Sequence, residues 1–288
     1  MNTIHHPAFV TASGRAVTRL GQGTWHLAEN HSRRESEIAA LRRGIELDLN
    51  LIDTAEMYGG GRSEALIGEA IRGHAREDLY LVSKVYPHNA GRANIFKSCE
   101  ASLKRLGTDY LDLYLLHWRG RVPLAETAEC MEELVSRGLI RHWGVSNLDT
   151  DDMRELAAVP HGKNCVTDQV LYHLASRGIE YDLLPWLEVQ GTTAMAYCPL
   201  AQYGDLQRGL IGNRGLTNVA RRHHASAAQI LLAFTLRHDF VIPIPKSSSP
   251  EHTEDNAGAL AIHLTEEDLR ELSQDFPAPT RKTWLDIV

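Results

Sequence analysis

Short apolar runs alternate with amphipathic helical segments along the whole chain, and this alternation constrains the fold more than any other feature. Seven runs cover residues 49–53, 79–84, 111–117, 140–147, 165–170, 192–197 and 240–246, and an eighth segment ends at Gly21-Gln22-Gly23-Thr24. The segments with helical spacing include Glu35–Leu47, Ser63–Arg72, Ala93–Leu106 and Glu126–Arg137. Apolar strands separated by helices are typical of a parallel sheet covered by helices. Eight such units predict a (β/α)8 barrel.

An open, doubly wound sheet is the alternative fold with the same alternation. Its dinucleotide-binding fingerprint, GxGxxG directly after the first strand, is absent, because Trp25 and His26 follow Gly21 and Gly23. The length of 288 residues suits one α/β barrel, and no linker or low-complexity tract divides the chain. We therefore predict a single barrel domain over residues 1–288.

Three more helical segments are expected near the C-terminus, which is more than the barrel repeat requires. They are Leu216–Arg222, Ser226–Arg237 and Glu266–Gln274. We expect Ser226–Arg237 to form an extra layer outside the barrel. The last segment begins with an N-cap, Thr265, followed by three acidic residues, which is a typical helix start.

Composition excludes several classes of function. A net charge of −7 gives no general attraction for nucleic acid or for anionic membranes. The four cysteines lie far apart without a CxxC pair, which indicates reduced thiols rather than a disulfide framework or a zinc ribbon. No export signal and no apolar stretch of about 20 residues is present. We expect a cytoplasmic protein, a monomer or weak oligomer, without nucleic-acid or membrane partners.

Polar residues mark the carboxyl ends of the predicted strands, where barrel enzymes build their active sites. Tyr58 lies in addition in a glycine-rich loop five residues after Asp53. The candidates at or just beyond the strand ends are Thr24, Trp25, Asp53, Lys84, His117, Ser146, Asn147, Gln169, Tyr197, Lys246 and Ser247.

Four of these residues suit the reduction of a carbonyl group. Hydride addition creates an alkoxide that needs a proton, and Tyr58 is the candidate acid. Lys84 is expected to lower the pKa of that phenol, and Asp53 is expected to hold the buried ammonium. His117 is expected to bind the substrate oxygen. Each residue alone also has a structural explanation, and the case for catalysis depends on their convergence.

A metal-dependent barrel hydrolase is the alternative enzyme class, because the chain has fifteen histidines. Their spacing does not favour it. His5-His6 and His223-His224 are adjacent, no HxH ends a strand, and no HExxH is present. We therefore predict no metal.

The sequence resembles the aldo-keto reductases over nearly all of its length, and most closely the bacterial members that reduce methylglyoxal and diketogulonate-type sugars. The motifs that carry the resemblance are GQGTWH (21–26), LIDTAEMYGGG (51–61), LVSKVY (81–86), YLDLYLLHW (110–118), LIRHWGVSN (139–147), AYCPL (196–200) and IPKSSSPEHTEDN (244–256). The resemblance implies a (β/α)8 barrel that reduces aldehydes or ketones with NADPH. It also implies that Asp53, Tyr58, Lys84 and His117 are the catalytic tetrad.

The resemblance further assigns the cofactor contacts. The nicotinamide carboxamide is expected at Ser146, Asn147 and Gln169, its ring at Tyr197, the 2′-phosphate at Lys246 and Ser247, and the adenine at Asp255 and Asn256. The remaining expected contacts are Gly23, Thr24, Trp25, Asp53, Cys198, Pro199, Leu200, Ser248 and His252.

Two positions depart from the family pattern. His252 stands where many members have an arginine that clamps the 2′-phosphate, and histidine lacks a guanidinium fork. We expect the preference for NADPH over NADH to be weakened but kept by Lys246. Cys198 replaces a common serine, and its weak S–H donor can lose one cofactor hydrogen bond.

The substrate pocket is expected to have an aromatic mouth. Trp25, Tyr86 and Trp118 lie just beyond strand ends, with Tyr58 and His117 beneath them. The tail after Phe276-Pro277-Ala278-Pro279 is short, which predicts an open site for small or varied carbonyls. The alternative from another class is a slow or non-catalytic barrel subunit that senses NADP(H) and binds a protein partner.

Overall fold

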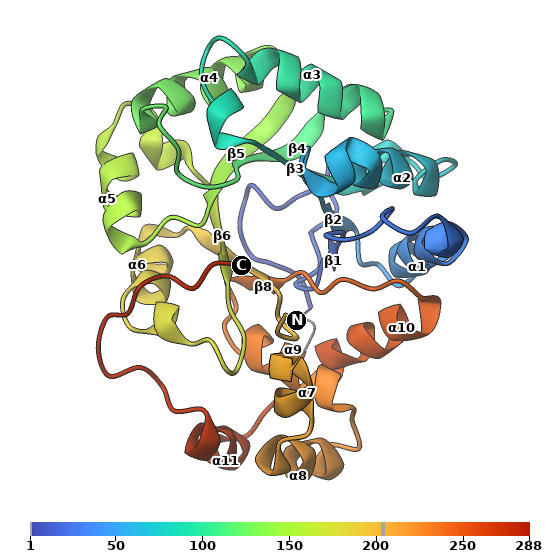
Figure 1. Cartoon of the computed structure of the whole chain (residues 1–288). Coiled ribbons are helices and arrows are strands. Elements are labelled where there is room, and N and C mark those ends of the chain that lie inside the picture. The colour runs from blue at the N-terminus through green and yellow to red at the C-terminus, as the bar shows by residue number, and fades with distance from the viewer. Residues whose placement is uncertain (1, 203–204) are drawn as a thin grey trace.

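The computed structural model describes residues 2–202 and 205–288. Within them, parallel strands pair in chain order around a barrel, and the amide hydrogens of Gly21 and Gly23 close it by donating to the carbonyls of Pro243 and Pro245 at 3.0 and 2.9 Å (Figure 1). The predicted (β/α)8 fold is confirmed. The strands are β1 (Gln22–Gly23), β2 (Leu51–Asp53), β3 (Tyr80–Val85), β4 (Leu111–Leu116), β5 (Ile140–Ser146), β6 (Thr167–Leu171), β7 (Thr193–Tyr197) and β8 (Val241–Pro243).

Helices surround the barrel (Figure 1). Those that follow the first six strands are α1 (Arg34–Glu46), α2 (Arg62–Ala70), α3 (Ile95–Leu106), α4 (Leu124–Ser136), α5 (Thr150–Ala158) and α6 (Leu183–Gln190). The helices after β7 and β8 are α7 (Asp205–Ile211), α8 (Arg214–Arg222), α9 (Ala227–Leu236), α10 (Pro250–Gly258) and α11 (Glu266–Asp275). The last of these is capped at Thr265, as predicted.

The expectation that residues 226–237 form an extra layer is wrong. Helix α9 is the crossover helix that packs on β8, and its residues Ile230–Leu236 are all buried. The extra layer consists of α8 and α11, which pack on each other at the edge of the molecule, outside α9 (Figure 1). A helix covered by the barrel on one side and by α8 on the other is apolar all round, so α9 shows no amphipathic pattern.

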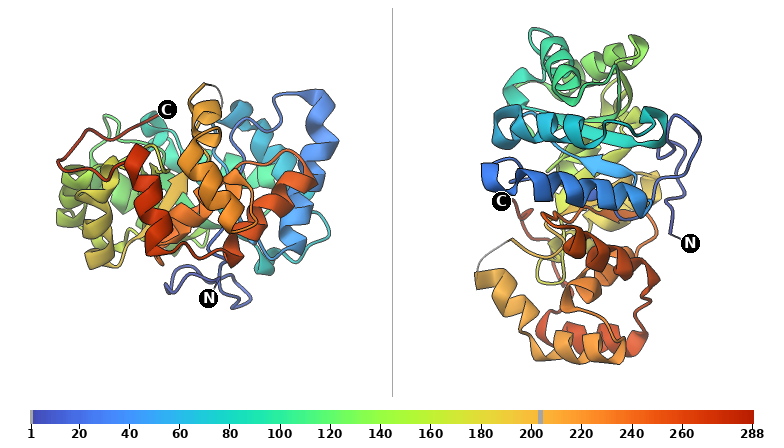
Figure 2. Two further views of the ribbon diagram at one scale, coloured as in Figure 1. Left: turned by 90° about the horizontal axis from the view of Figure 1, so that it is seen from below. Right: turned by 90° about the vertical axis from the view of Figure 1, so that its right-hand side faces the viewer.

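An N-terminal segment fills one end of the barrel. Residues 3–18 form antiparallel bridges, and Phe9 stacks on Tyr80 of β3 with ring centroids 5.4 Å apart. The Tyr80 hydroxyl donates to the carbonyl of Ala8 at 2.9 Å. Figure 2 shows the N-terminus and the C-terminus at opposite ends of the barrel. The carboxyl ends of the strands are therefore the end at which polar side chains can meet a ligand.

The closure of the barrel requires a glycine at position 23. A Cβ atom added to Gly23 would lie 2.4 Å from the carbonyl oxygen of Ile244. Any side chain there would force β1 away from the segment after β8. The close approach of two backbone segments thus explains Gly23, the second glycine of the GQGTWH motif.

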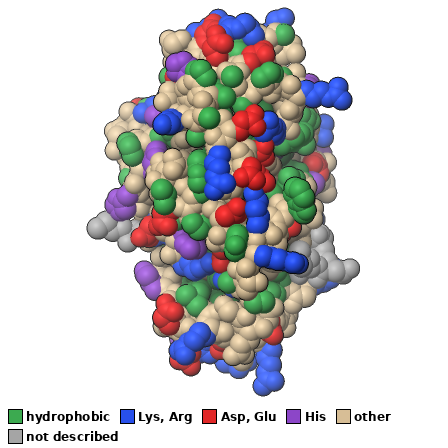
Figure 3. Space-filling view, turned by 90° about the vertical axis from the view of Figure 1, so that its left-hand side faces the viewer, with side chains coloured by type: hydrophobic (Ala, Val, Ile, Leu, Met, Phe, Trp, Pro, Cys, Tyr) green, Lys and Arg blue, Asp and Glu red, His purple; other side chains and the backbone are tan. Residues whose placement is uncertain are grey.

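The outer surface mixes charges of both signs. On the face that carries α5 and α6, acidic and basic side chains are interspersed and apolar side chains are scattered (Figure 3). This pattern is typical of a solvated surface. In the described part of the chain, the helices are too short or too polar to cross a membrane.

Candidate active site

A buried ion pair lies at the centre of the carboxyl end of the barrel. The Lys84 ammonium donates to both carboxylate oxygens of Asp53, at 2.8 and 2.7 Å, and to the carbonyl oxygen of Thr54 at 2.7 Å. Lys84 is fully buried and Asp53 is 2% exposed. Burial raises the pKa of the Asp53 carboxyl and lowers that of the Lys84 ammonium, and the charge of each partner opposes the shift of the other. Three acceptors therefore hold the ammonium in one place.

Tyr58 approaches this pair from a short loop. It begins a 3-10 helix over Tyr58–Gly61, and its phenol oxygen lies 3.3 Å from the Lys84 nitrogen. The loop can turn back over the barrel because Gly59, Gly60 and Gly61 all have positive φ angles. The predicted convergence of a loop tyrosine with Lys84 and Asp53 is present in the structure.

The expectation that Lys84 lowers the pKa of Tyr58 is wrong for this structure. Burial and then the Asp53 carboxylate hold the pKa of the phenol well above its usual value. The ammonium donates to the phenol oxygen at 3.3 Å, but burial and the carboxylate act on the pKa in the opposite direction and outweigh this contact. Tyr58 is therefore a protonated phenol at neutral pH, and it can donate that proton.

His117 completes the group of four. It follows β4, is 8% exposed, and its ring lies edge-on to Tyr58 with centroids 5.7 Å apart. Burial, and next the nearby Lys84 charge, lowers the pKa of the imidazole to about 2. The ring is thus neutral at physiological pH. Its buried Nδ1 has no hydrogen-bond partner among the described residues.

An amide-rich cluster lies beside the tetrad at the ends of β5, β6 and β7. The Tyr197 hydroxyl donates to Asn147 Oδ1 at 2.8 Å, and Asn147 Nδ2 donates to Ser146 Oγ at 3.1 Å. Ser146 Oγ donates to the carbonyl of Gln169 at 2.8 Å, and Gln169 Nε2 donates to Asp53 Oδ1 at 2.8 Å. One chain of hydrogen bonds therefore joins the four predicted nicotinamide contacts to the Asp53 carboxylate.

The other predicted cofactor residues lie around the same end of the barrel. Thr24 follows β1, and its hydroxyl donates to the carbonyl of Asp53 at 2.8 Å. Cys198, Pro199 and Leu200 follow β7. Cys198 has a φ angle of 48° and is half-buried, and burial raises the pKa of its thiol to about 11, so it carries its proton.

The residues after β8 form a separate group near β1. Lys246 is exposed, and its backbone bridges to Gly23, while Ser247 and Ser248 precede α10. Helix α10 carries exposed His252 and buried Asn256, and Asn256 lines a small pocket with Gly23 and Ser247. Asp255 faces another element, because its carboxylate accepts a hydrogen bond from Ser226 at 2.8 Å.

The chain matches known proteins over almost its whole length. The model of the aldo/keto reductase family matches residues 19–274. The chain belongs to the aldo/keto reductase family. It is 54% identical over 273 residues to the methylglyoxal reductase YeaE of Escherichia coli, covering 95% of this chain and 96% of that one. It is 34% identical over 259 residues to the glyoxal reductase of Bacillus subtilis, covering 89% and 88%.

Solved structures agree with this assignment. An aldo-keto reductase from Klebsiella pneumoniae in complex with NADPH superposes with a TM-score of 0.95 at 52% identity, covering 100% of both chains. The thermostable aldo-keto reductase Tm1743 superposes with a TM-score of 0.81 at 39% identity, covering 92% and 97%. The predicted family is confirmed, and with it the prediction that the chain is an oxidoreductase.

Two of the three predicted aromatic rings of this aldo/keto reductase meet above the tetrad. Tyr86 and Trp118 pack edge to face with centroids 5.9 Å apart, and Trp118 lies 4.9 Å from the ring of His117. Trp25 instead stacks on His26 at 4.4 Å. The described rings next to His117 are therefore those of Tyr58 and Trp118, with Tyr86 behind Trp118.

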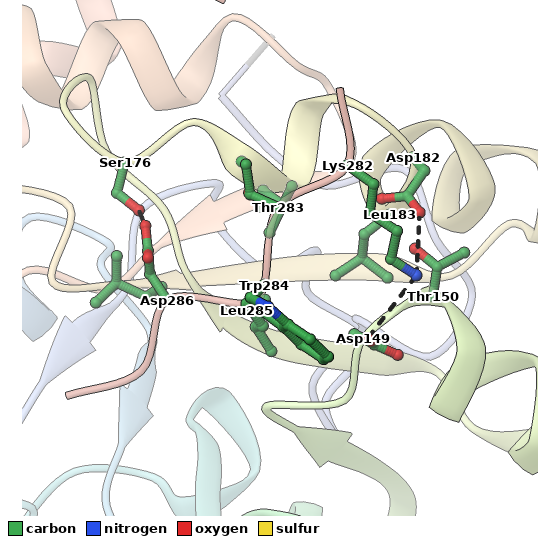
Figure 4. Close-up of a pocket in the computed structure, with 13 residues that line it drawn as sticks. Asp149, Thr150, Ser176, Asp182, Leu183, Lys282, Thr283, Trp284, Leu285 and Asp286 are labelled. Carbon is green, nitrogen blue, oxygen red and sulfur yellow. Dashed lines mark hydrogen bonds and ion pairs between the residues drawn. The ribbon is translucent and has the colours of Figure 1, made fainter. Parts of the chain in front are cut away.

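The segment after α11 lies across the barrel rim. Lys282 binds a carboxylate at the start of α5 at 2.8 Å, and Ser176 donates to Asp286 at 2.5 Å. The backbone of Val288 interacts with the Tyr197 phenol. Figure 4 shows the pocket between this segment and the loops after β5 and β6. The tail therefore reaches the β5–β7 side of the rim, and the open site expected from its short length stays a prediction.

Sequence reasoning missed some contributors to the site. The third acceptor for Lys84 is the backbone carbonyl of Thr54, which any residue would provide. The backbone amide of Tyr86 is held by the Glu56 carboxylate at 2.7 Å, across 30 residues of sequence. Glu56 stands two residues before Tyr58 in the LIDTAEMYGGG motif, and this acidic residue close to Tyr58 was the available signal. Among the described residues, no group of three or more His, Cys, Asp or Glu is arranged to hold a metal ion.

Proposed function

We propose that this chain is an NADPH-dependent reductase of small aldehydes such as methylglyoxal, with Tyr58 as the proton donor. The observation that carries the proposal is the protonated Tyr58 phenol, 3.3 Å from the ammonium of a buried Lys84–Asp53 pair and beside a neutral His117. The relatives support the substrate class, because one is named a methylglyoxal reductase and another a glyoxal reductase.

The residues present fit a dinucleotide cofactor. Asn147 and Gln169 offer amide groups beside the tetrad, and Tyr197 offers an aromatic face at the end of β7. For the adenosine end of the cofactor, Lys246 offers an exposed cation. Helix α10 begins at Pro250 after the Ser249 cap, and its N-terminus offers backbone N–H groups. These groups match a carboxamide, a flat ring and phosphates in turn. We assign the nicotinamide to the first set and the 2′-phosphate to the second, with Ser247, Ser248 and His252 next to it.

When bound, the reduced nicotinamide supplies the hydride that adds to the carbonyl carbon. The oxygen of the substrate then gains negative charge, and the Tyr58 O–H donates its proton to that oxygen. The phenolate left behind is stabilised by the Lys84 ammonium at 3.3 Å. Asp53 keeps the ammonium in position throughout, because both its oxygens accept from it. Solvent returns the proton to Tyr58.

His117 is assigned the orientation of the substrate. A neutral imidazole can donate one hydrogen bond to a carbonyl oxygen without competing as an acid. Its low pKa, about 2, ensures that form across the physiological range. The neighbouring ring of Trp118 and the ring of Tyr86 give the pocket an apolar wall, which suits a short carbon chain.

The test is steady-state oxidation of NADPH with purified protein and a panel of carbonyls. We expect many turnovers with methylglyoxal and other short aldehydes, lower kcat/KM with a bulky steroid ketone, and unchanged rates in the presence of a chelator. Equal kcat/KM for methylglyoxal and the steroid ketone would reject the small-aldehyde assignment. Oxidation of no more than one NADPH per protein molecule would instead support the cofactor-sensing alternative.

A further inference from the structure

A buried carboxylate lies behind the tetrad and takes no part in the chemistry described above. Glu64, in the first turn of α2, is fully buried. It accepts a hydrogen bond from Ser83 Oγ at 2.6 Å and one from Arg105 Nε at 2.5 Å. A buried carboxyl group without partners is costly, so these two donors stabilise Glu64 in its buried position.

The two donors come from the elements next to α2. Ser83 directly precedes Lys84 on β3, and successive side chains of a strand point to opposite faces. Lys84 therefore faces the barrel interior and Asp53, whereas Ser83 faces the helix layer and Glu64. Arg105 lies at the end of α3, where it also donates to Ser102 at 3.2 Å. Glu64 thus ties α2 to the strand that carries Lys84 and to the neighbouring helix.

Arg105 also packs directly under the loop that carries Tyr58. A Cβ atom on Gly61, the last residue of that loop, would lie 2.6 Å from both Cδ and Nε of Arg105. Gly61 also has a φ angle of +86°, which side chains rarely adopt. The arginine stem occupies the space in which a larger loop residue would sit, so the position of Arg105 limits how closely the loop can approach α3.

A second set of contacts fixes the start of α2 on the barrel side. The Ser63 hydroxyl donates to Thr24 Oγ1 at 2.9 Å, and the Thr54 hydroxyl lies 3.3 Å from Ser63 Oγ. The start of α2 is therefore held through Ser63 by the residues that directly follow β1 and β2, and through Glu64 by β3 and α3.

These contacts bear on the distance between the two central atoms of the site. The Lys84 ammonium is fixed by Asp53 and by the Thr54 carbonyl, so the phenol oxygen of Tyr58 is the movable partner. Its loop runs directly into the residues that Glu64 and Arg105 hold. We infer that Glu64 and Arg105 are positioning residues for the reaction, which set the Tyr58 phenol against Lys84. This inference rests on the proposed role of Tyr58.

The experiment compares Glu64→Gln and Arg105→Lys with a matched control, Glu69→Gln. Glu69 lies on the same helix and pairs with Arg34 on the outer side, away from the catalytic loop. Glu64→Gln keeps the shape of the side chain and removes the carboxylate, and Arg105→Lys keeps the charge and loses the Nε atom that donates to Glu64 and packs against Gly61. The measurements are kcat and KM for methylglyoxal, the dissociation constant of NADPH, the solvent deuterium isotope effect on kcat, and the melting temperature.

A displaced phenol slows proton transfer without removing a binding contact. Misplacement of a catalytic group by about 1 Å can cost ~100-fold in rate, so we expect kcat to fall by between about 10-fold and 100-fold in Glu64→Gln and Arg105→Lys. KM and the NADPH dissociation constant stay within about twofold, and the solvent isotope effect on kcat rises because proton transfer limits the rate. Glu69→Gln keeps the wild-type values. Arg105→Lys serves as the milder variant if Glu64→Gln folds poorly.

A Tyr58→Phe background separates the two proposals. If Glu64 acts through Tyr58, then Glu64→Gln adds no further loss of kcat in Tyr58→Phe. If Tyr58→Phe is slow but Glu64→Gln folds and keeps the wild-type kcat, the positioning role is overturned and the proposed function stands. A Tyr58→Phe enzyme at wild-type kcat overturns the proposed function itself. A melting temperature lowered in Glu64→Gln and Arg105→Lys with kcat and the isotope effect unchanged assigns the pair to stability and overturns the inference.

Discussion

Replacing Asp53 by asparagine is the perturbation whose cost follows most directly from the structure. The Lys84 ammonium is fully buried, and Asp53→Asn removes its counter-charge while leaving the Thr54 carbonyl at 2.7 Å as the remaining strong acceptor. Breaking a buried pair from one side costs about 3–5 kcal/mol, because the other charge stays uncompensated. We therefore expect Asp53→Asn to lower the free energy of unfolding by about that amount. Lys84→Met should cost a similar amount, because it isolates the carboxylate.

The double variant Asp53→Asn, Lys84→Met tests whether this reasoning is right. Neither charge remains in the double variant, so its loss of stability should be smaller than the sum of the two single losses by at least about 2 kcal/mol. Losses at two independent sites add to within about 0.5 kcal/mol, so this difference is measurable. The assay is urea unfolding at pH 7 followed by circular dichroism. The exposed pair of Arg92 and Glu129 is the control, and Glu129→Gln should leave the unfolding midpoint nearly unchanged. Single losses that simply add would refute the view that an uncompensated charge causes them.

Three further predictions concern His117, His252 and Gly23. In the unfolded chain the His117 imidazole has a pKa near 6.5, whereas burial lowers this pKa to about 2 in the folded chain, so the neutral imidazole lowers the free energy of unfolding by about 2 kcal/mol at pH 5. Urea unfolding should therefore show a smaller loss of stability between pH 7 and pH 5 for His117→Gln than for the wild type. Equal losses in the two proteins would contradict this. The NADPH dissociation constant should stay below that of NADH although His252 lacks a guanidinium fork, because Lys246 remains as an exposed cation, whereas equal constants would exclude an anion contact. Gly23→Ala should lower stability by about 1–3 kcal/mol in the same unfolding assay, because its Cβ would lie 2.4 Å from the Ile244 carbonyl oxygen, and a wild-type midpoint would refute the steric argument.

The barrel and the four central residues were predictable because each depends on a local pattern. Apolar runs mark buried parallel strands, and the residues that end them share one rim, which brings Asp53, Lys84 and His117 together. Tyr58 was predictable as well, since three glycines leave its loop free to fold back over that rim.

What the sequence did not reveal depends on the surroundings of a residue rather than on its neighbours in the chain. The sequence did not show that α9, rather than α7 or α8, packs on β8. Helix α9 is buried on both sides, so its apolar residues do not follow the spacing of an amphipathic helix. The pKa of Tyr58 is raised by burial and then by the Asp53 carboxylate, whereas only the Lys84 charge entered the prediction. The contact of Glu64 with Arg105 spans 41 residues of sequence.

The account depends above all on the Tyr58 hydroxyl as the source of the proton. The most direct measurement is the single-turnover rate of methylglyoxal reduction by Tyr58→Phe with NADPH bound, together with the NADPH dissociation constant. General acid catalysis typically contributes ~10²–10⁴-fold, so the rate should fall by at least about 100-fold while NADPH binds as tightly as before. A Tyr58→Phe protein that reduces methylglyoxal at the wild-type rate would show that another group supplies the proton.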